Sequence, residues 1–226
     1  MEPDNPLLDE FVLTCARDAR ATERPRVCFV PTASGDAEGY VARFYRAFSS
    51  LDCQLADLQL FARTVEDLEA FVLAQDVIYV GGGNTANLLA VWRVHGLDRI
   101  LHKAWEQGVV LTGLSAGMNC WFAESVTDSY GADTLRPLHD GLGLLPGSAC
   151  PHYDGEEQRR PTFRRLVGEQ ALGNGWAADD GAALVFDGGR LAEVVASRPA
   201  ATGYRVERTS SGAVHEQALP TRYLGT

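Results

Sequence analysis

The sequence is short of long hydrophobic runs and of positive charge. No stretch of its 226 residues reaches the roughly 18 consecutive apolar residues that a membrane-spanning helix needs. Lys and Arg together number 20 against 30 Asp and Glu, which gives a formal net charge of −10. Because phosphate groups and anionic headgroups bind to basic surfaces, we expect neither nucleic acid nor a membrane as the main partner.

The sequence also lacks paired cysteines. Its cysteines are scattered, odd in number and outside any CxxC pair: Cys15, Cys28, Cys53, Cys120 and Cys150. This pattern predicts neither a zinc site nor a disulfide framework, and it is typical of reduced thiols. The first residues, MEPDNPLLDEF, are acidic and do not have the basic and then apolar signature of a signal peptide. We therefore expect a cytoplasmic protein.

The apolar residues that are present suffice for one core. They make up 46% of the composition, and the length fits a single domain over residues 1–226. Buried runs such as 26–31 alternate with helix-like segments such as 38–48, which is typical of parallel βαβ units. Hairpin signals around 187–189 and 211–212 predict antiparallel strands in the last third. The predicted fold is α/β, a mostly parallel sheet flanked by helices with antiparallel C-terminal strands.

One serine stands between two glycines, in the stretch VVLTGLSAGMNCW. The strand-like residues 109–112 run into Gly113, Ser115 and Gly117, and residues 118–122 read as the start of a buried helix. In a strand–turn–helix elbow, flanking glycines relieve crowding around a strained backbone and the hydroxyl is exposed. The N–H groups of the following helix would then favour a developing oxyanion. The alternative is a tight structural turn packed with small residues.

A second glycine run follows a buried strand, in YVGGGNTANLL. Its backbone N–H groups can approach a ligand closely, so the run is a candidate second oxyanion donor. The alternative is structural, with Asn84 or Thr85 capping the next helix. The run is not a GxGxxG motif, and we find neither a phosphate-binding Lys nor a ribose-binding acid to accompany it.

A serine nucleophile needs a base, and His152 is the strongest candidate. It follows a short apolar run and Pro151 in GSACPHYDGEE, so a strand-end loop would hold it. The other histidines lie in predicted helices, a polar loop or a hairpin: His95, His102, His139 and His215. Asp179 and Asp180 in GWAADDGAALVF are candidates for the third member, which would orient the imidazole. The alternative for them is a solvated turn.

These motifs together resemble a known family. GGGNT, GLSAGMN, PHY and an acid–Gly pair occur in this order from about residue 26 onward, and they resemble the peptidase E and cyanophycinase family of serine peptidases. The resemblance implies a fold related to class I glutamine amidotransferases. It implies Ser115 as nucleophile, His152 as base, Asp180 as third triad member, and the N–H groups of Gly83 and Ala116 as oxyanion donors. It implies no metal and no cofactor.

The sequence departs from the peptidase E pattern in two places. Peptidase E removes N-terminal Asp from dipeptides, and here the corresponding stretch, SVTDSYG, keeps an acid at Asp128 among different neighbours. Asp128 is a candidate for binding the free amine of a substrate. An anionic side chain would need a cation such as Arg159 or Arg160, although a solvated helix start is the plainer interpretation of these two arginines. The family usually opens with a strand, whereas this sequence opens in a predicted helix.

The combined expectation is a cytoplasmic serine exopeptidase that hydrolyses dipeptides or short peptides with a free N-terminus, with N-terminal Asp as one candidate. Its partner would be a small peptide substrate, and the resemblance suits a monomer or a homodimer. An alternative is an esterase or amidase acting on small molecules. A further alternative is a non-catalytic binding protein on the same scaffold.

Overall fold

A computed structural model describes residues 1–2, 4–131 and 134–225 of the chain. The chain divides into two compact units, Met1–Gly117 and Met118–Thr226. Each unit has its own sheet system and is described by itself. The expectation of one domain over residues 1–226 stays a prediction.

The first unit contains a parallel sheet with the strand order β2-β1-β3-β4. Its strands are β1 (Arg26–Val30), β2 (Gln54–Asp57), β3 (Val77–Val80) and β4 (Val110–Gly113). Four residues of β1 and all of β3 are buried, as expected for central strands covered on both faces. The parallel βαβ organisation predicted for this part of the chain is therefore confirmed.

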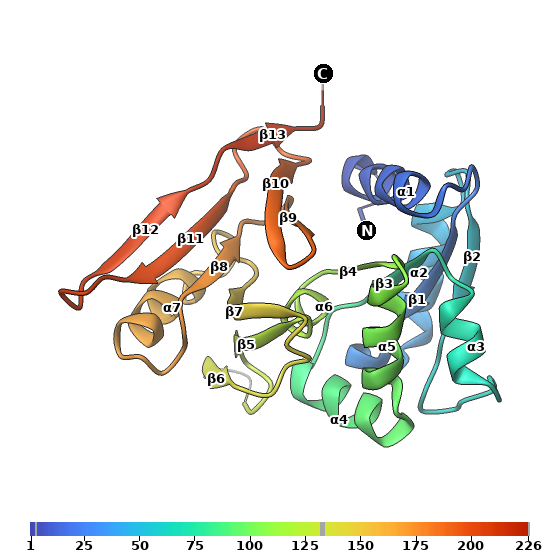
Figure 1. Cartoon of the computed structure of the whole chain (residues 1–226), viewed down its shortest axis with the longest axis horizontal. Coiled ribbons are helices and arrows are strands. Elements are labelled where there is room, and N and C mark those ends of the chain that lie inside the picture. Colours follow the sequence, from blue (N-terminus) through green and yellow to red (C-terminus); the bar gives the residue numbers. More distant parts are fainter. Residues whose placement is uncertain (3, 132–133, 226) are drawn as a thin grey trace. The chain divides into compact units, whose positions relative to one another are not determined.

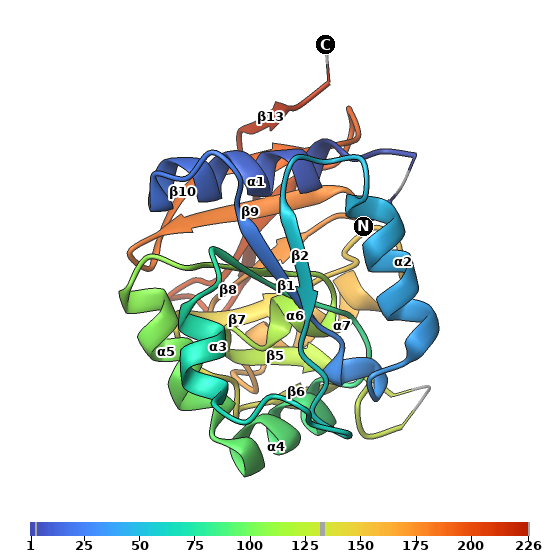
Figure 2. The same cartoon turned by 90° about the vertical axis from the view of Figure 1, so that its right-hand side faces the viewer.

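Helices cover this sheet. They are α1 (Leu7–Arg20), α2 (Glu38–Phe48), α3 (Leu68–Leu73), α4 (Thr85–His95) and α5 (Leu97–Glu106). Apolar residues of α1 and α2, among them Leu13 and Phe44, pack with Val27, Phe29 and Tyr79 of the sheet in one buried cluster. Figure 2 shows α3 and α5 on the other side of the strands from α2. Successive side chains of a strand point to opposite faces, so the continuous apolar runs supply both helical layers.

The second unit is built on a mixed sheet with the order β12-β11-β8-β7-β5-β6. Its strands are β5 (Phe122–Thr127), β6 (Arg136–Leu138), β7 (Leu145–Cys150), β8 (Gly175–Ala178), β11 (Gly203–Arg208) and β12 (Val214–Ala218). The central pairs β5–β7 and β7–β8 are parallel, and the outer pairs are antiparallel. Figure 1 shows helix α7 (Arg159–Gly168) beside this sheet. Its residues Phe163, Leu166 and Val167 pack in one buried cluster with residues of the strands.

A smaller sheet completes the second unit, with the order β13-β10-β9. Its strands are β9 (Ala182–Asp187), β10 (Arg190–Ala196) and β13 (Thr221–Tyr223). The hairpin expected around 187–189 is the antiparallel pair β9–β10, and the hairpin expected around 211–212 is the pair β11–β12. The antiparallel C-terminal strands are therefore confirmed, although β10 and β13 pair in parallel.

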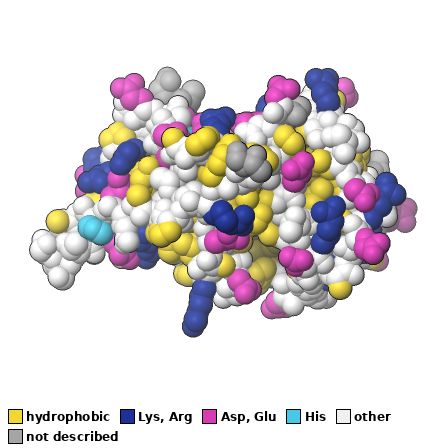
Figure 3. Space-filling view, turned by 90° about the horizontal axis from the view of Figure 1, so that it is seen from above, with side chains coloured by type: hydrophobic (Ala, Val, Ile, Leu, Met, Phe, Trp, Pro, Cys, Tyr) yellow, Lys and Arg dark blue, Asp and Glu magenta, His cyan; other side chains and the backbone are white. Residues whose placement is uncertain are grey.

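The surface carries both signs of charge. On the face drawn in Figure 3, acidic and basic side chains alternate among hydrophobic ones, and no large area is covered by basic side chains alone. Among the described helices, none is both long enough and apolar enough to cross a membrane.

Candidate active site

Ser115 occupies a sharp turn at the end of β4. Its φ is +57°, in the left-handed region that a residue with a side chain seldom adopts. The neighbouring glycines are sterically required: a methyl group on Gly117 would lie 2.3 Å from the carbonyl oxygen of Val80, and one on Gly113 would lie 2.7 Å from the same atom. The backbone of the elbow therefore packs directly against β3, and this close packing holds Ser115 in its strained conformation.

The helix after the elbow is shorter than the sequence predicts. Helix α6 spans only Ala116–Asn119, and Phe122 already begins β5, where it pairs with Leu145 of β7. The expectation of a helix starting over 118–122 is right for residues 118 and 119 and wrong for Phe122, because tertiary strand pairing of this buried aromatic overrides the local helical pattern. A single turn carries little dipole, so α6 offers individual N–H groups rather than the positive end of a long helix.

The glycine run lies against the serine elbow. A methyl group on Gly82 would lie 3.1 Å from Cβ of Ser115, and one on Gly83, whose φ is +139°, would lie 2.2 Å from the carbonyl oxygen of Ala33. Only glycine fits at position 83. Of the two residues predicted to cap α4, the cap is Asn84, whose side chain accepts a hydrogen bond from the N–H of Asn87 at 2.8 Å. The structural interpretation of this run, a helix cap, is therefore confirmed, and the run also lies close to Ser115.

His152 lies in the second unit, in the loop after β7. Its φ is +56°, and its Nδ1 lies 2.7 Å from Oδ1 of Asp180. The N–H of Tyr153 donates to the carbonyl oxygen of Ala178 at 3.0 Å, so the end of β8 anchors this loop. A carboxylate at Nδ1 favours the tautomer with the proton on Nδ1, which makes Nε2 the proton acceptor.

The two adjacent acids have different surroundings. The N–H of Asp180 donates to Oδ1 of Asp154 at 2.7 Å, and the Asp180 carboxylate lies over Gly155, where a methyl group would come within 2.2 Å of Oδ2. Asp179 is 6% exposed, and its Oδ2 accepts hydrogen bonds from the N–H of Thr202 and the hydroxyl of Tyr204. Burial raises the pKa of Asp179. Asp180 is the acid in contact with the imidazole.

Arg159 is buried, with 3% of its side chain exposed. Its Nε donates to Oε2 of Glu156 at 2.6 Å, its Nη1 donates to the carbonyl oxygen of Val126 at 3.3 Å, and its Nη2 lies 3.8 Å from Oδ2 of Asp128. The interpretation of Arg159 as a solvated helix residue is wrong, because the end of β5 and the loop after His152 enclose it. Two carboxylates share its single positive charge.

Arg160 makes structural contacts. Its guanidinium stacks on the rings of Tyr153 and Tyr204, with centroid distances of 5.3 and 5.2 Å, and it forms an ion pair with Glu216 of β12. The hydroxyl of Tyr153 also donates to Glu216, at 2.6 Å. These contacts join α7 to β11 and β12, so this half-exposed arginine is engaged on its own unit.

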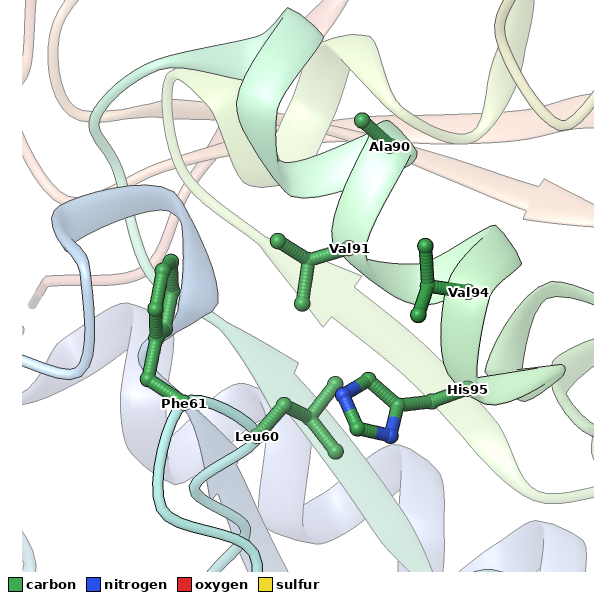
Figure 4. A pocket seen from close by; sticks show the side chains of 6 residues that line it. All are labelled: Leu60, Phe61, Ala90, Val91, Val94 and His95. Atoms are coloured by element: carbon green, nitrogen blue, oxygen red, sulfur yellow. The ribbon is translucent and has the colours of Figure 1, made fainter.

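An apolar groove lies elsewhere in the first unit, with a volume of about 350 Å³. Figure 4 shows its lining side chains, which come from α4 and from the segment after β2: Leu60, Phe61, Ala90, Val91, Val94 and His95. None of the predicted site residues lines it. Among the described residues, no three His, Cys, Asp or Glu side chains gather as a metal site.

The structure brings together some predicted site residues and adds others. His152 contacts Asp180, Asp128 lies beside Arg159, and the glycine run adjoins Ser115. The sequence interpretation missed three neighbours of the predicted site residues. The hydroxyl oxygen of Tyr40 accepts a hydrogen bond from the N–H of Gly82 at 2.9 Å, and Asp180 lies against Asp154 and Gly155. The last two follow His152 in the same PHYDG run, so their position was visible, whereas nothing in the pattern of α2 distinguished Tyr40 from a core aromatic.

Comparison with known proteins gives consistent results. Residues 2–194 match Peptidase family S51. The chain is 51% identical over 225 residues to the peptidase YgaJ of Bacillus subtilis, covering 100% of this chain and 94% of that protein. It is 34% identical over 131 residues to a peptidase E of Streptomyces coelicolor, covering 57% of this chain and 51% of that protein. The crystal structure of a peptidase from an acI-B1 Actinobacterium has the same fold, with a TM-score of 0.73 and 18% identity over 96% of this chain and 89% of that one.

Proposed function

The chain belongs to peptidase family S51 and is a serine peptidase of the peptidase E type, and from this premise we propose that it is an exopeptidase acting on dipeptides or short peptides with a free N-terminus. Ser115 is the nucleophile, His152 is the base and Asp180 orients the imidazole. The N–H groups of Gly83 and Ala116 stabilise the oxyanion.

The chemistry follows the acyl-transfer scheme. Ser115 Oγ attacks the scissile carbonyl carbon while His152 Nε2 takes the hydroxyl proton. The carbonyl oxygen becomes an oxyanion, and the two N–H donors stabilise it. His152 then passes the proton to the leaving amine. Water next attacks the acyl carbon while His152 takes one of its protons, the bond from Ser115 Oγ to the acyl group breaks, and His152 returns the proton to Ser115 Oγ. The observation that carries the proposal is the 2.7 Å contact between His152 Nδ1 and Asp180 Oδ1, which prepares the imidazole for both proton transfers.

The charges around Arg159 support recognition of a substrate amine. Asp128 and Glu156 both approach this arginine, and each carboxylate is about half exposed. Two negative charges against one positive charge leave a local excess of negative charge, which favours an ammonium group. We propose that Asp128 binds the free N-terminal amine. Recognition of an N-terminal Asp side chain would require Arg159 or Arg160 to exchange one of its present carboxylate partners.

Hydrolysis of a panel of X-Leu dipeptides, free and N-acetylated, tests this function. The proposal predicts cleavage of free dipeptides and at least a hundredfold lower kcat/KM after acetylation, because acetylation removes the charge that Asp128 binds. Asp128→Asn raises KM for free dipeptides and leaves the acetylated ones unaffected. Cleavage of free Asp-Leu alone would identify a strict aspartyl dipeptidase. Equal cleavage of free and acetylated substrates, or hydrolysis of esters but of no dipeptide, would contradict the proposal.

We also propose that the enzyme is cytoplasmic. All five cysteines are thiols rather than disulfide partners, and the four at positions 28, 53, 120 and 150 are buried, which suits a reducing compartment such as the cytoplasm. The substrate is a small peptide. Sedimentation of the purified chain decides between a monomer and a homodimer.

A further inference from the structure

Three consecutive backbone N–H groups in the glycine run, those of residues 82 to 84, differ in their hydrogen bonding. The N–H of Gly82 donates to the hydroxyl oxygen of Tyr40 at 2.9 Å, and the N–H of Asn84 donates to the carbonyl oxygen of Ala33 at 2.8 Å. Within the part of the chain that the structure describes, the N–H of Gly83 between them makes no hydrogen bond. Hydrogen bonds therefore hold the glycine run on both sides of the N–H of Gly83, which is left to donate to a ligand.

The acceptors of these two hydrogen bonds belong to different elements. Ala33 belongs to the short 3₁₀ helix η1 (Thr32–Ser34) after β1, and its backbone packs so tightly on Gly83 that no side chain fits there. Tyr40 belongs to α2 and reaches the loop from another direction. The loop conformation therefore depends on one backbone contact and one side-chain hydroxyl.

The ring of Tyr40 is fixed by packing. It meets Phe29 edge to face at a centroid distance of 5.2 Å, and a methyl group on Gly81 would lie 3.0 Å from Cε1 of Tyr40. Glycine at position 81 leaves just enough room for the ring. Burial raises the pKa of Tyr40, so this residue is a neutral phenol at pH 7, and its hydroxyl oxygen accepts the hydrogen bond from the N–H of Gly82.

We propose that Tyr40 is a positioning residue for the oxyanion hole: by accepting the hydrogen bond from Gly82, it fixes the peptide plane between Gly81 and Gly82, from which the next peptide directs the N–H of Gly83 toward the substrate oxygen at Ser115. This inference rests on the proposed serine-peptidase function and adds to it a residue outside the triad and outside the two donors. It predicts that the hydroxyl matters for catalysis, whereas a purely structural role would need only the aromatic ring.

Tyr40→Phe separates these roles because it keeps the ring and removes only the hydroxyl. Tyr45→Phe is the matched control. Tyr45 lies on the same helix, and its hydroxyl donates to Oδ1 of Asp57 at 2.8 Å, away from the glycine loop. Both variants lose one hydrogen-bonded tyrosine hydroxyl, so Tyr45→Phe shows what such a loss does when it occurs away from the glycine run. Circular dichroism and thermal melting verify folding.

Two measurements test the effect of removing the Tyr40 hydroxyl. The first is amide hydrogen exchange at Gly82 by NMR, for which Tyr40→Phe predicts exchange about tenfold faster than in the wild type, in keeping with the loss of one hydrogen bond. The second is the second-order rate of phosphonylation of Ser115 by a fluorophosphonate, which needs no knowledge of the peptide substrate. We expect this rate to fall on the order of tenfold in Tyr40→Phe, less than the 10²–10³-fold loss on removing an oxyanion donor itself. Tyr45→Phe leaves both quantities within twofold of the wild type.

The outcomes distinguish the inference from the function on which it rests. Faster exchange at Gly82 together with slower phosphonylation in Tyr40→Phe alone supports the inference. Unchanged phosphonylation of Tyr40→Phe, while Ser115→Ala is inert and the wild type reacts, overturns the inference and leaves the peptidase proposal standing. Unchanged exchange at Gly82 likewise overturns it. A wild type no more reactive than Ser115→Ala contradicts the proposed function itself, and the role of Tyr40 in catalysis falls with it.

Discussion

Gly155 is the residue that allows Asp180 to reach His152, and Gly155→Ala tests the importance of this approach. A methyl group at position 155 would lie 2.2 Å from Oδ2 of Asp180, whereas ordinary contact begins near 3.4 Å. The carboxylate must therefore withdraw by about 1 Å, and from 2.7 Å its distance to the imidazole would pass the upper limit of about 3.2 Å for a hydrogen bond.

We predict that Gly155→Ala lowers kcat roughly a hundredfold, the usual cost of a misplacement of about 1 Å in a catalytic group. KM changes little, because the substrate does not depend on this contact. The assay is steady-state hydrolysis of whichever free dipeptide the wild type cleaves best. The NMR signal of the imidazole Nδ1 proton is a second readout, and we expect it to move upfield as the hydrogen bond lengthens.

Gly131→Ala is the matched control for this variant. Gly131 lies in the same unit, and among the residues that the structure describes a methyl group there would meet no atom within 4 Å. We expect its kcat to equal that of the wild type. A folded Gly155→Ala protein with kcat within twofold of the wild type would refute the claim that the approach of Asp180 to His152 is required.

Two further predictions concern acids of the second unit. Asp180→Asn should lower kcat by 10³-fold or more, since the amide no longer stabilises the charged imidazole of His152; Asp179→Asn should retain kcat within a few fold and melt no lower at pH 7, because burial already disfavours its charge. Equal losses in both variants would show the assignment of the triad acid to be wrong. Glu216 has a lowered pKa: burial alone would raise it, but hydrogen bonds from Tyr153 and two arginines of α7 outweigh burial. A lowered carboxyl pKa contributes stability that is present above the unfolded value of about 4.3 and is lost as the pH falls through the folded value. Urea denaturation of Glu216→Gln between pH 3 and 6 should therefore show a weaker dependence on pH than the wild type, and an unchanged dependence would contradict this account.

The sequence allowed correct prediction where local chemistry and fold agreed. The serine elbow, the glycine run and the parallel strands of the first unit follow from apolar runs that end in glycine, because the carboxyl ends of parallel strands meet at one edge. The hairpins around 187–189 and 211–212 follow from turn residues. In each case a short stretch of sequence determines the local backbone.

Prediction was poorer where long-range contacts decide. The helix expected to start over 118–122 ends at residue 119, and residue 122 belongs to strand β5, because the pairing of β5 with β7 is non-local. The solvated interpretation of Arg159 was wrong, since its neighbours Asp128 and Val126 lie more than thirty residues away in sequence. The residue pattern also left open the choice between Asp179 and Asp180, because only the tertiary position of Gly155 and Asp154 brings one of them to the imidazole.

The measurement that tests the central claim most directly is turnover of a free dipeptide by wild type and by Ser115→Ala, after circular dichroism has shown that both are folded. The account predicts that Ser115→Ala loses turnover to background, by up to about 10⁶-fold as for the loss of a serine nucleophile in other enzymes. Turnover by folded Ser115→Ala within tenfold of the wild type would contradict the assignment of Ser115 as the nucleophile and, with it, the proposed mechanism.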